Sequence, residues 1–158
     1  MLKKLALALI ITISALAPAR AEIFYTLDNG LKVYIKQVPN QKFIMSRLIV
    51  HKGFASDTKA GLAHLTEHLA FQNTDKYDYD YLSKLFLGRG KFVMNATTTR
   101  TSTEYDAFGM YTKSNLDEVN SVLSQILMHI KPTEKGIEKE KLIVEQERKL
   151  RKLKDGAT

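Results

Sequence analysis

Residues 91–111 read KFVMNATTTRTSTEYDAFGMY and are rich in threonine and aromatic side chains. β-Branched and aromatic residues favour extended backbone, so this stretch predicts two neighbouring strands. A helix capped by Ser114-Asn115 is predicted next, because apolar residues recur with helical spacing until Pro132 stops it, at positions 116, 119, 122, 123, 126, 127 and 130. A second helix, dense in Glu and Lys, is predicted from Thr133 to Lys154.

Upstream of this stretch the sequence predicts a hairpin, a strand and two helices. The hairpin spans Ile23 to Val38 and turns at Asn29-Gly30, because Asn-Gly favours the tight turns that join antiparallel strands. An apolar run from Phe43 to Val50 has the length of a further strand. Helices are predicted from about Lys59 to Phe71 and from Tyr81 to Leu87. This order predicts an α+β fold, with a mostly antiparallel sheet covered by helices.

The composition excludes several kinds of site. The 158 residues include no cysteine, which excludes a disulfide scaffold, an iron–sulfur site and a cysteine nucleophile. Any metal site must therefore be built from His, Asp and Glu. The net charge is +7, but bases and acids are interspersed, so we expect no nucleic-acid partner.

The first 21 residues, MLKKLALALIITISALAPARA, have the layout of a secretory signal peptide. Lys3 and Lys4 precede an apolar run from Leu5 to Leu16, and Ala19-Arg20-Ala21 supplies the small residues of a cleavage site. The apolar run is too short for a membrane span, which needs roughly 20 residues. We expect cleavage after Ala21, no stable membrane anchor afterwards, and a location across the inner membrane, in the periplasm.

Residues 61–74, GLAHLTEHLAFQNT, contain two histidines and a glutamate whose spacing is suited to binding a metal ion. His64 and His68 are four residues apart, so on a helix their imidazoles lie on one face and can meet one zinc ion. Glu67 lies on the same arc and can reach a water on that ion, which makes it a candidate general base. The order H-x-x-E-H is the signature of one class of zinc peptidases.

A catalytic zinc needs a third protein ligand besides the two histidines. Carboxylates are common in that role, and the charged C-terminal helix offers five candidates, Glu134, Glu138, Glu140, Glu145 and Glu147. His51 and His129 are the remaining imidazoles and are less favoured. Composition alone does not choose among these residues.

The sequence resembles the pitrilysin-type zinc peptidases, the family of insulin-degrading enzyme and the mitochondrial processing peptidase. In that family the third ligand is a Glu about 76 residues after H-x-x-E-H, which corresponds here to Glu145. A second Glu stands seven residues earlier, at Glu138, where we expect it to hydrogen-bond a ligand histidine or the metal-bound water and orient it. The family's Asn-Ala-x-Thr segment stands here at residues 95–98, followed by Thr103-Glu104-Tyr105. The resemblance implies an edge strand in which Asn95 and Ala96 contact substrate.

The resemblance implies that residues 22–158 form a partial pitrilysin-type zinc peptidase domain, because family members are much longer and carry a second, similar domain. The implied activity is zinc-dependent endopeptidase hydrolysis of peptides or unfolded proteins, with one Zn²⁺ per chain and Glu67 as general base. The alternative is a non-catalytic zinc-binding fragment or subunit that needs a second homologous domain or partner chain for activity.

Overall fold

The computed structural model describes residues 22–155, which fall into two compact units that divide after Gln41. The first unit is an antiparallel hairpin of β1 (Glu22–Thr26) and β2 (Lys32–Lys36). Its turn holds Gly30 at φ 85°, a left-handed conformation that glycine adopts without strain. The hairpin predicted at Asn29-Gly30 is therefore confirmed.

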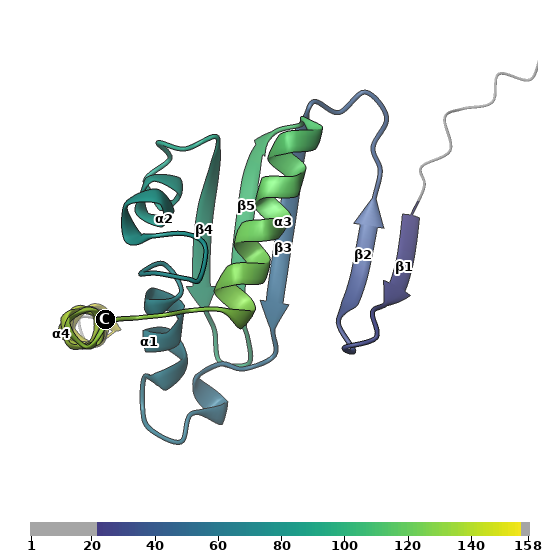
Figure 1. Cartoon of the computed structure of the whole chain (residues 1–158). Helices are drawn as coiled ribbons and strands as arrows, with labels where there is room; N and C mark the ends of the chain where they lie inside the picture. The colour runs from purple at the N-terminus through teal and green to yellow at the C-terminus, as the bar shows by residue number, and fades with distance from the viewer. Residues whose placement is uncertain (1–21, 156–158) are drawn as a thin grey trace, which may run out of the picture. The chain divides into compact units, whose positions relative to one another are not determined.

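The second unit is built on a three-stranded antiparallel sheet of β3 (Phe43–Val50), β4 (Phe92–Thr98) and β5 (Thr103–Met110). The strand order is β3-β5-β4, so β5 is central and β4 lies at an edge (Figure 1). The register pairs Thr98 with Thr103 at one end of β4 and Phe92 with Gly109 at the other. Both strands predicted within residues 91–111 are thus present as a hairpin.

One face of this sheet is covered by helices. α3 (Lys113–Met128) packs on β3 and β5, whereas α1 (Leu62–Leu69) and α2 (Tyr79–Phe86) pack on β4 (Figure 1). The short 3-10 helix η1 (Phe54–Ser56) precedes α1. The core between the layers is apolar and includes Leu82, Leu85, Phe92, Met94, Ala107, Val119 and Val122. The predicted α+β fold is confirmed.

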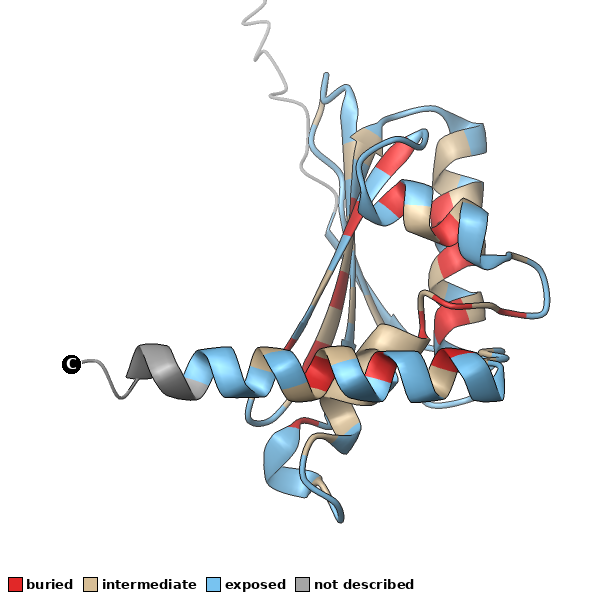
Figure 2. Ribbon diagram, turned by 90° about the vertical axis from the view of Figure 1, so that its left-hand side faces the viewer, coloured by how far each residue is buried: buried red, intermediate tan, exposed pale blue. Residues whose placement is uncertain are grey.

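The last helix, α4 (Glu134–Asp155), packs against α1. Figure 2 shows buried positions that recur along α4 about one turn apart, at Gly136, Glu140 and Val144. Two of these three positions carry no charge, but Glu140 is a buried acid with 5% exposure. A charged group in that position needs hydrogen-bonding partners, and they identify the site described below.

The start of α1 is fixed by two local features. Gly61 has φ 87°, a left-handed conformation that directs the chain into the helix. The Asp57 carboxylate accepts hydrogen bonds from the backbone N–H groups of Gly61 and Ala63, which satisfies donors that the first helical turn leaves open. The α3 cap differs from the prediction, because the Thr112 hydroxyl oxygen accepts from Asn115 N–H, so the helix begins one residue before Ser114.

The signal peptide predicted at residues 1–21 lies outside the described residues. Among residues 22–155, no helix combines the length and the apolar character that crossing a bilayer requires.

Candidate metal centre and active site

The two histidines of the H-x-x-E-H motif lie side by side on α1. The ring centroids of His64 and His68 are 4.8 Å apart, with the rings nearly perpendicular. Both side chains are largely buried, with 12% and 19% exposure. The helical spacing predicted from the sequence therefore brings both imidazoles to one place.

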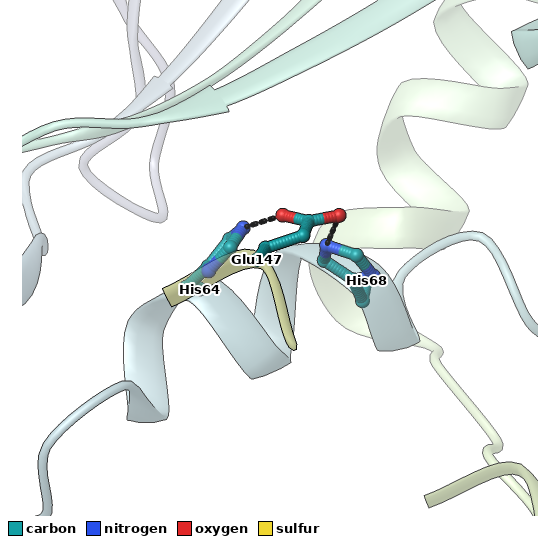
Figure 3. A group of neighbouring side chains, drawn as sticks. All are labelled: His64, His68 and Glu147. Carbon is teal, nitrogen blue, oxygen red and sulfur yellow. Dashed lines mark ion pairs between the residues drawn. The ribbon is translucent and has the colours of Figure 1, made fainter. Parts of the chain in front are cut away.

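The third member of the cluster comes from α4 and is Glu147 (Figure 3). Its Oε2 lies 3.3 Å from His64 Nε2, and its Oε1 lies 3.8 Å from His68 Nε2. One ligand atom from each residue lies within 4.8 Å of the others, and among the described side chains no other His, Asp or Glu triad does so. The ligand atoms of a tetrahedral zinc, each about 2 Å from the ion, lie about 3.3 Å apart. The donor set and its spacing therefore fit zinc.

The two α4 residues expected from the resemblance lie elsewhere. Glu145 accepts hydrogen bonds from the Arg148 guanidinium at 3.1 and 3.0 Å, and Glu138 accepts one from Lys141 at 2.6 Å. Positions two apart on an α-helix point about 160° away from each other. The α4 face that meets α1 therefore carries Glu147 in place of Glu145, and Glu140 in place of Glu138.

Glu140 on α4 contacts the cluster at His68, on the ring nitrogen away from Glu147. Its Oε2 lies 2.9 Å from His68 Nδ1, and its Oε1 accepts a hydrogen bond of 2.7 Å from Gln72 Nε2. A carboxylate beside Nδ1 holds the imidazole proton on that nitrogen. The lone pair of His68 is then on Nε2, the atom that faces Glu147.

His64 is prepared for metal binding by its surroundings. Burial lowers the pKa of its imidazole, and the neighbouring His68 lowers it further. The lowered pKa favours the neutral ring, which is the form that binds a metal ion. The His68 contribution follows from the four-residue spacing on α1, whereas the burial of His64 comes from tertiary packing that the spacing does not show.

The candidate general base, Glu67, lies between the two histidines in sequence and is held by β4. Its Oε2 accepts a hydrogen bond from the Thr98 hydroxyl. Thr98 in turn lies 3.4 Å from the Thr103 hydroxyl, which donates to the carbonyl oxygen of Lys52 at 2.9 Å. Thr103 uses its proton on that carbonyl and so does not donate to Thr98, and the Thr98 hydroxyl donates to its nearer acceptor, the Glu67 carboxylate. The sequence pattern by itself predicts no separate role for Thr98.

The residues expected to contact substrate lie on β4, whose last residue is Thr98. Among the described strands β4 pairs only with β5, so its other edge is open to a further strand. Asn95 is exposed, and Ala96 is half-buried on the face that also carries Thr98. The remaining histidines lie away from the cluster: His51 is exposed after β3, and His129 Nδ1 lies 3.1 Å from Asp75.

Comparison with known proteins shows the family of the chain. The sequence model of the insulinase family, peptidase family M16, matches residues 32–155. The chain belongs to this family. The family is one of zinc peptidases, and two histidines with one glutamate are among the donor sets found at catalytic zinc sites.

The M16 chain has relatives of known name and structure. It is 30% identical over 132 residues to the zinc protease PqqE of Helicobacter pylori. The aligned region covers 80% of this chain and 28% of that protein. The crystal structure of a protease from Helicobacter pylori has a TM-score of 0.74 and 25% identity, over 84% of this chain and 32% of that one. The first half of the periplasmic protease PqqL from Escherichia coli shares the fold, with a TM-score of 0.69 and 22% identity over 82% of this chain and 29% of that one.

The M16 chain matches only part of each relative. It spans between 23% and 28% of the length of two curated relatives, a mitochondrial-processing peptidase subunit alpha of Bos taurus and the PqqE protease. The matched parts make up 77% and 80% of this chain, respectively.

Proposed function

We propose that this chain carries the zinc site and the general base of a peptidase, with His64, His68 and Glu147 as zinc ligands. The observation that carries the proposal is the convergence of two elements far apart in sequence. The histidines come from α1, the carboxylate comes from α4, and no ligand atom lies more than 4.8 Å from another. Three protein ligands leave a fourth position open, as in catalytic zinc sites.

Each nearby residue has a defined role in the proposed hydrolysis. Zinc, when bound, would supply a Lewis acid and lower the pKa of water. Glu67 is the base that takes a proton from the attacking water and can return it to the leaving amine. Thr98 orients the Glu67 carboxylate, and Glu140 orients His68. The chain thereby supplies orientation and proton transfer.

The proposed substrate is a peptide or an unfolded protein in extended conformation. The open edge of β4 offers backbone N–H and C=O groups with which an extended peptide can pair as an added strand. Asn95 and Ala96 lie on this strand, and Thr98 connects its end to the general base. Substrate bound along β4 would therefore pass close to Glu67.

Two further parts of the proposal concern partner and compartment. Because the chain covers about a quarter to a third of its relatives, we propose that a second homologous domain or chain completes the enzyme. The leader-like residues 1–21 and the description of PqqL as periplasmic support a periplasmic location. A non-catalytic zinc-binding fragment or subunit, dependent on a partner chain, is the second candidate, favoured by the same partial coverage.

The test compares Glu67→Gln with the parent protein and with Glu138→Gln, an exposed glutamate control on α4. Glu67→Gln should keep its zinc and lose peptide hydrolysis by about 10²–10⁴-fold, since it keeps the shape of the base without its basicity. Glu138→Gln should keep both properties. If the chain alone is inert, the assay is repeated with the second half of a relative supplied in trans. A Glu67→Gln rate near the parent rate contradicts the peptidase proposal, and a parent that binds zinc but never cleaves favours the non-catalytic subunit.

A further inference from the structure

Gln72 makes a buried contact that the proposed mechanism does not use. It lies in the turn after α1, where its backbone N–H donates to the Leu69 carbonyl at 3.1 Å. Its side-chain Nε2 donates to Glu140 Oε1 at 2.7 Å. The two residues are 9% and 5% exposed. The contact therefore joins the end of α1 to the first part of α4, away from solvent.

The hydrogen bonds of Glu140 leave little freedom for its carboxylate. One oxygen is beside His68 Nδ1 at 2.9 Å, and the other accepts from Gln72. If the Gln72 amide were removed, Oε1 would be a buried carboxylate oxygen without that donor, which is costly. Rotation of the carboxylate toward another donor would loosen its contact with His68.

The surroundings hold Gln72 at this position. The carbonyl of Asn73 accepts from Lys131 N–H at 2.7 Å, and Thr74 forms a β-bridge with Ile130, so the segment after Gln72 is tied to the residues that lead into α4. A Cβ on Gly136 would lie 3.1 Å from Gln72 Oε1, so the absence of a side chain at Gly136 makes room for the amide. The amide is thus placed by its neighbours.

We infer that Gln72 is a positioning residue of the metal centre, which acts through Glu140 to keep the His68 proton on Nδ1 and leave Nε2 ready for a metal ion. The inference rests on the proposed zinc function for its consequence. The structural part concerns only the tautomer of His68, which can be measured without metal. A failure of the inferred role of Gln72 can therefore be told apart from a failure of the proposed zinc function.

The first experiment measures zinc affinity by competition with a chromophoric chelator. Gln72→Met has nearly the same size but no donor, and it should bind zinc about tenfold more weakly, at the lower end of the effect of residues that orient metal ligands. Gln146→Met, the same change at an exposed position of α4, should bind zinc like the parent. In the background of Glu140→Gln, Gln72→Met should change the affinity by less than about twofold, because the two residues act in one chain.

The second experiment records ¹⁵N NMR shifts of the histidine side chains in the metal-free protein. The parent should show His68 protonated at Nδ1, and Gln72→Met should shift His68 toward the Nε2–H tautomer while the fold remains. Gln72→Asn, whose amide is one methylene shorter, should show a smaller shift in the same direction and serves if Gln72→Met does not fold.

The outcomes decide the inference. A folded Gln72 variant with the parental His68 tautomer overturns it, as does a loss of zinc affinity that is equal with and without Glu140. A lower melting temperature with no tautomer change assigns Gln72 a purely structural role and also overturns it. A parent chain that binds no zinc would contradict the proposed function, while the tautomer measurement would still decide the role of Gln72.

Discussion

Glu140 Oε2 lies 2.9 Å from Nδ1 of His68, so a buried acid on α4 orients an imidazole on α1. Seven residues later on α4, which is two helical turns, Glu147 faces the Nε2 atoms of both histidines. The two acids therefore have different roles on one helix face. Glu140 orients His68, and Glu147 is one of the proposed ligands.

The ligand assignment predicts opposite results for two neighbouring glutamates. Glu147→Gln should lower zinc affinity by more than about a hundredfold, beyond the ~10–100-fold typical of residues that only orient ligands. Glu145→Gln should stay near the parent value, because Glu145 pairs with Arg148 on another side of α4. Chelator competition measures both. Full affinity in Glu147→Gln and a loss in Glu145→Gln would favour Glu145, the ligand that the family resemblance implies.

The orienting role predicts a second contrast. Glu140→Gln should weaken zinc binding by about 10–100-fold, since it removes the carboxylate that holds the His68 proton on Nδ1. Glu138→Gln should have no such effect, because Glu138 is exposed and pairs with Lys141. Metal analysis after dialysis against a weak chelator tests both variants, and equal losses would contradict this division of roles.

Thr98 should affect turnover and leave metal binding intact. Thr98→Val removes the hydroxyl that donates to Glu67 and keeps the side-chain volume. We expect kcat to fall about 10–100-fold in an active form of the protein, as misplacement of a reacting group typically causes. KM and zinc affinity should change little, and Thr98→Ser should recover most of the rate.

Thr101→Val, a threonine exposed in the turn between β4 and β5, is the matched control for this variant. It should keep the parental kcat. If Thr98→Val turns over like the parent, the hydroxyl does not orient Glu67.

A pH dependence is expected from Glu118 on α3. The hydrogen bond from Tyr81 and, second, the bond from Lys91 lower the pKa of Glu118 below its usual value of 4.5. As the pH falls, the unfolded chain takes up this proton before the folded chain does, so the stabilisation is present above about pH 4.5 and is lost below it. Glu118→Gln should therefore lower the free energy of unfolding near neutral pH by about 1–2 kcal/mol.

Urea unfolding of the parent and Glu118→Gln between about pH 7 and pH 3 checks this prediction, because the two stabilities should converge on acidification. Asp117→Asn, which breaks an exposed pair with Lys113 on the same helix, should change stability by less than about 0.5 kcal/mol throughout. A difference between parent and Glu118→Gln that stays constant with pH would contradict the assigned pKa shift.

Local patterns in the sequence determined much of this structure. Asn29-Gly30 specified the hairpin turn, the β-branched residues of 91–111 specified β4 and β5, and the spacing of His64 and His68 placed two imidazoles on one helix face. These features depend on backbone propensity and on helical or strand periodicity, which act over a few residues. They could therefore be read without knowledge of the packing.

The choice of the α4 glutamates depended on tertiary structure. Glu138 and Glu145 have the same separation as Glu140 and Glu147, so the seven-residue spacing fits both pairs, and a count along the chain from His68 changes with the length of every intervening loop. What selects Glu140 and Glu147 is the face of α4 that packs on α1, the face of Gly136 and Val144. The sequence by itself determined that His64 and His68 share one face of a helix, and it predicted a zinc site there. Only the packing of α4 against α1 decided which carboxylates reach it, because rotation by two residues turns a helical side chain to the opposite side.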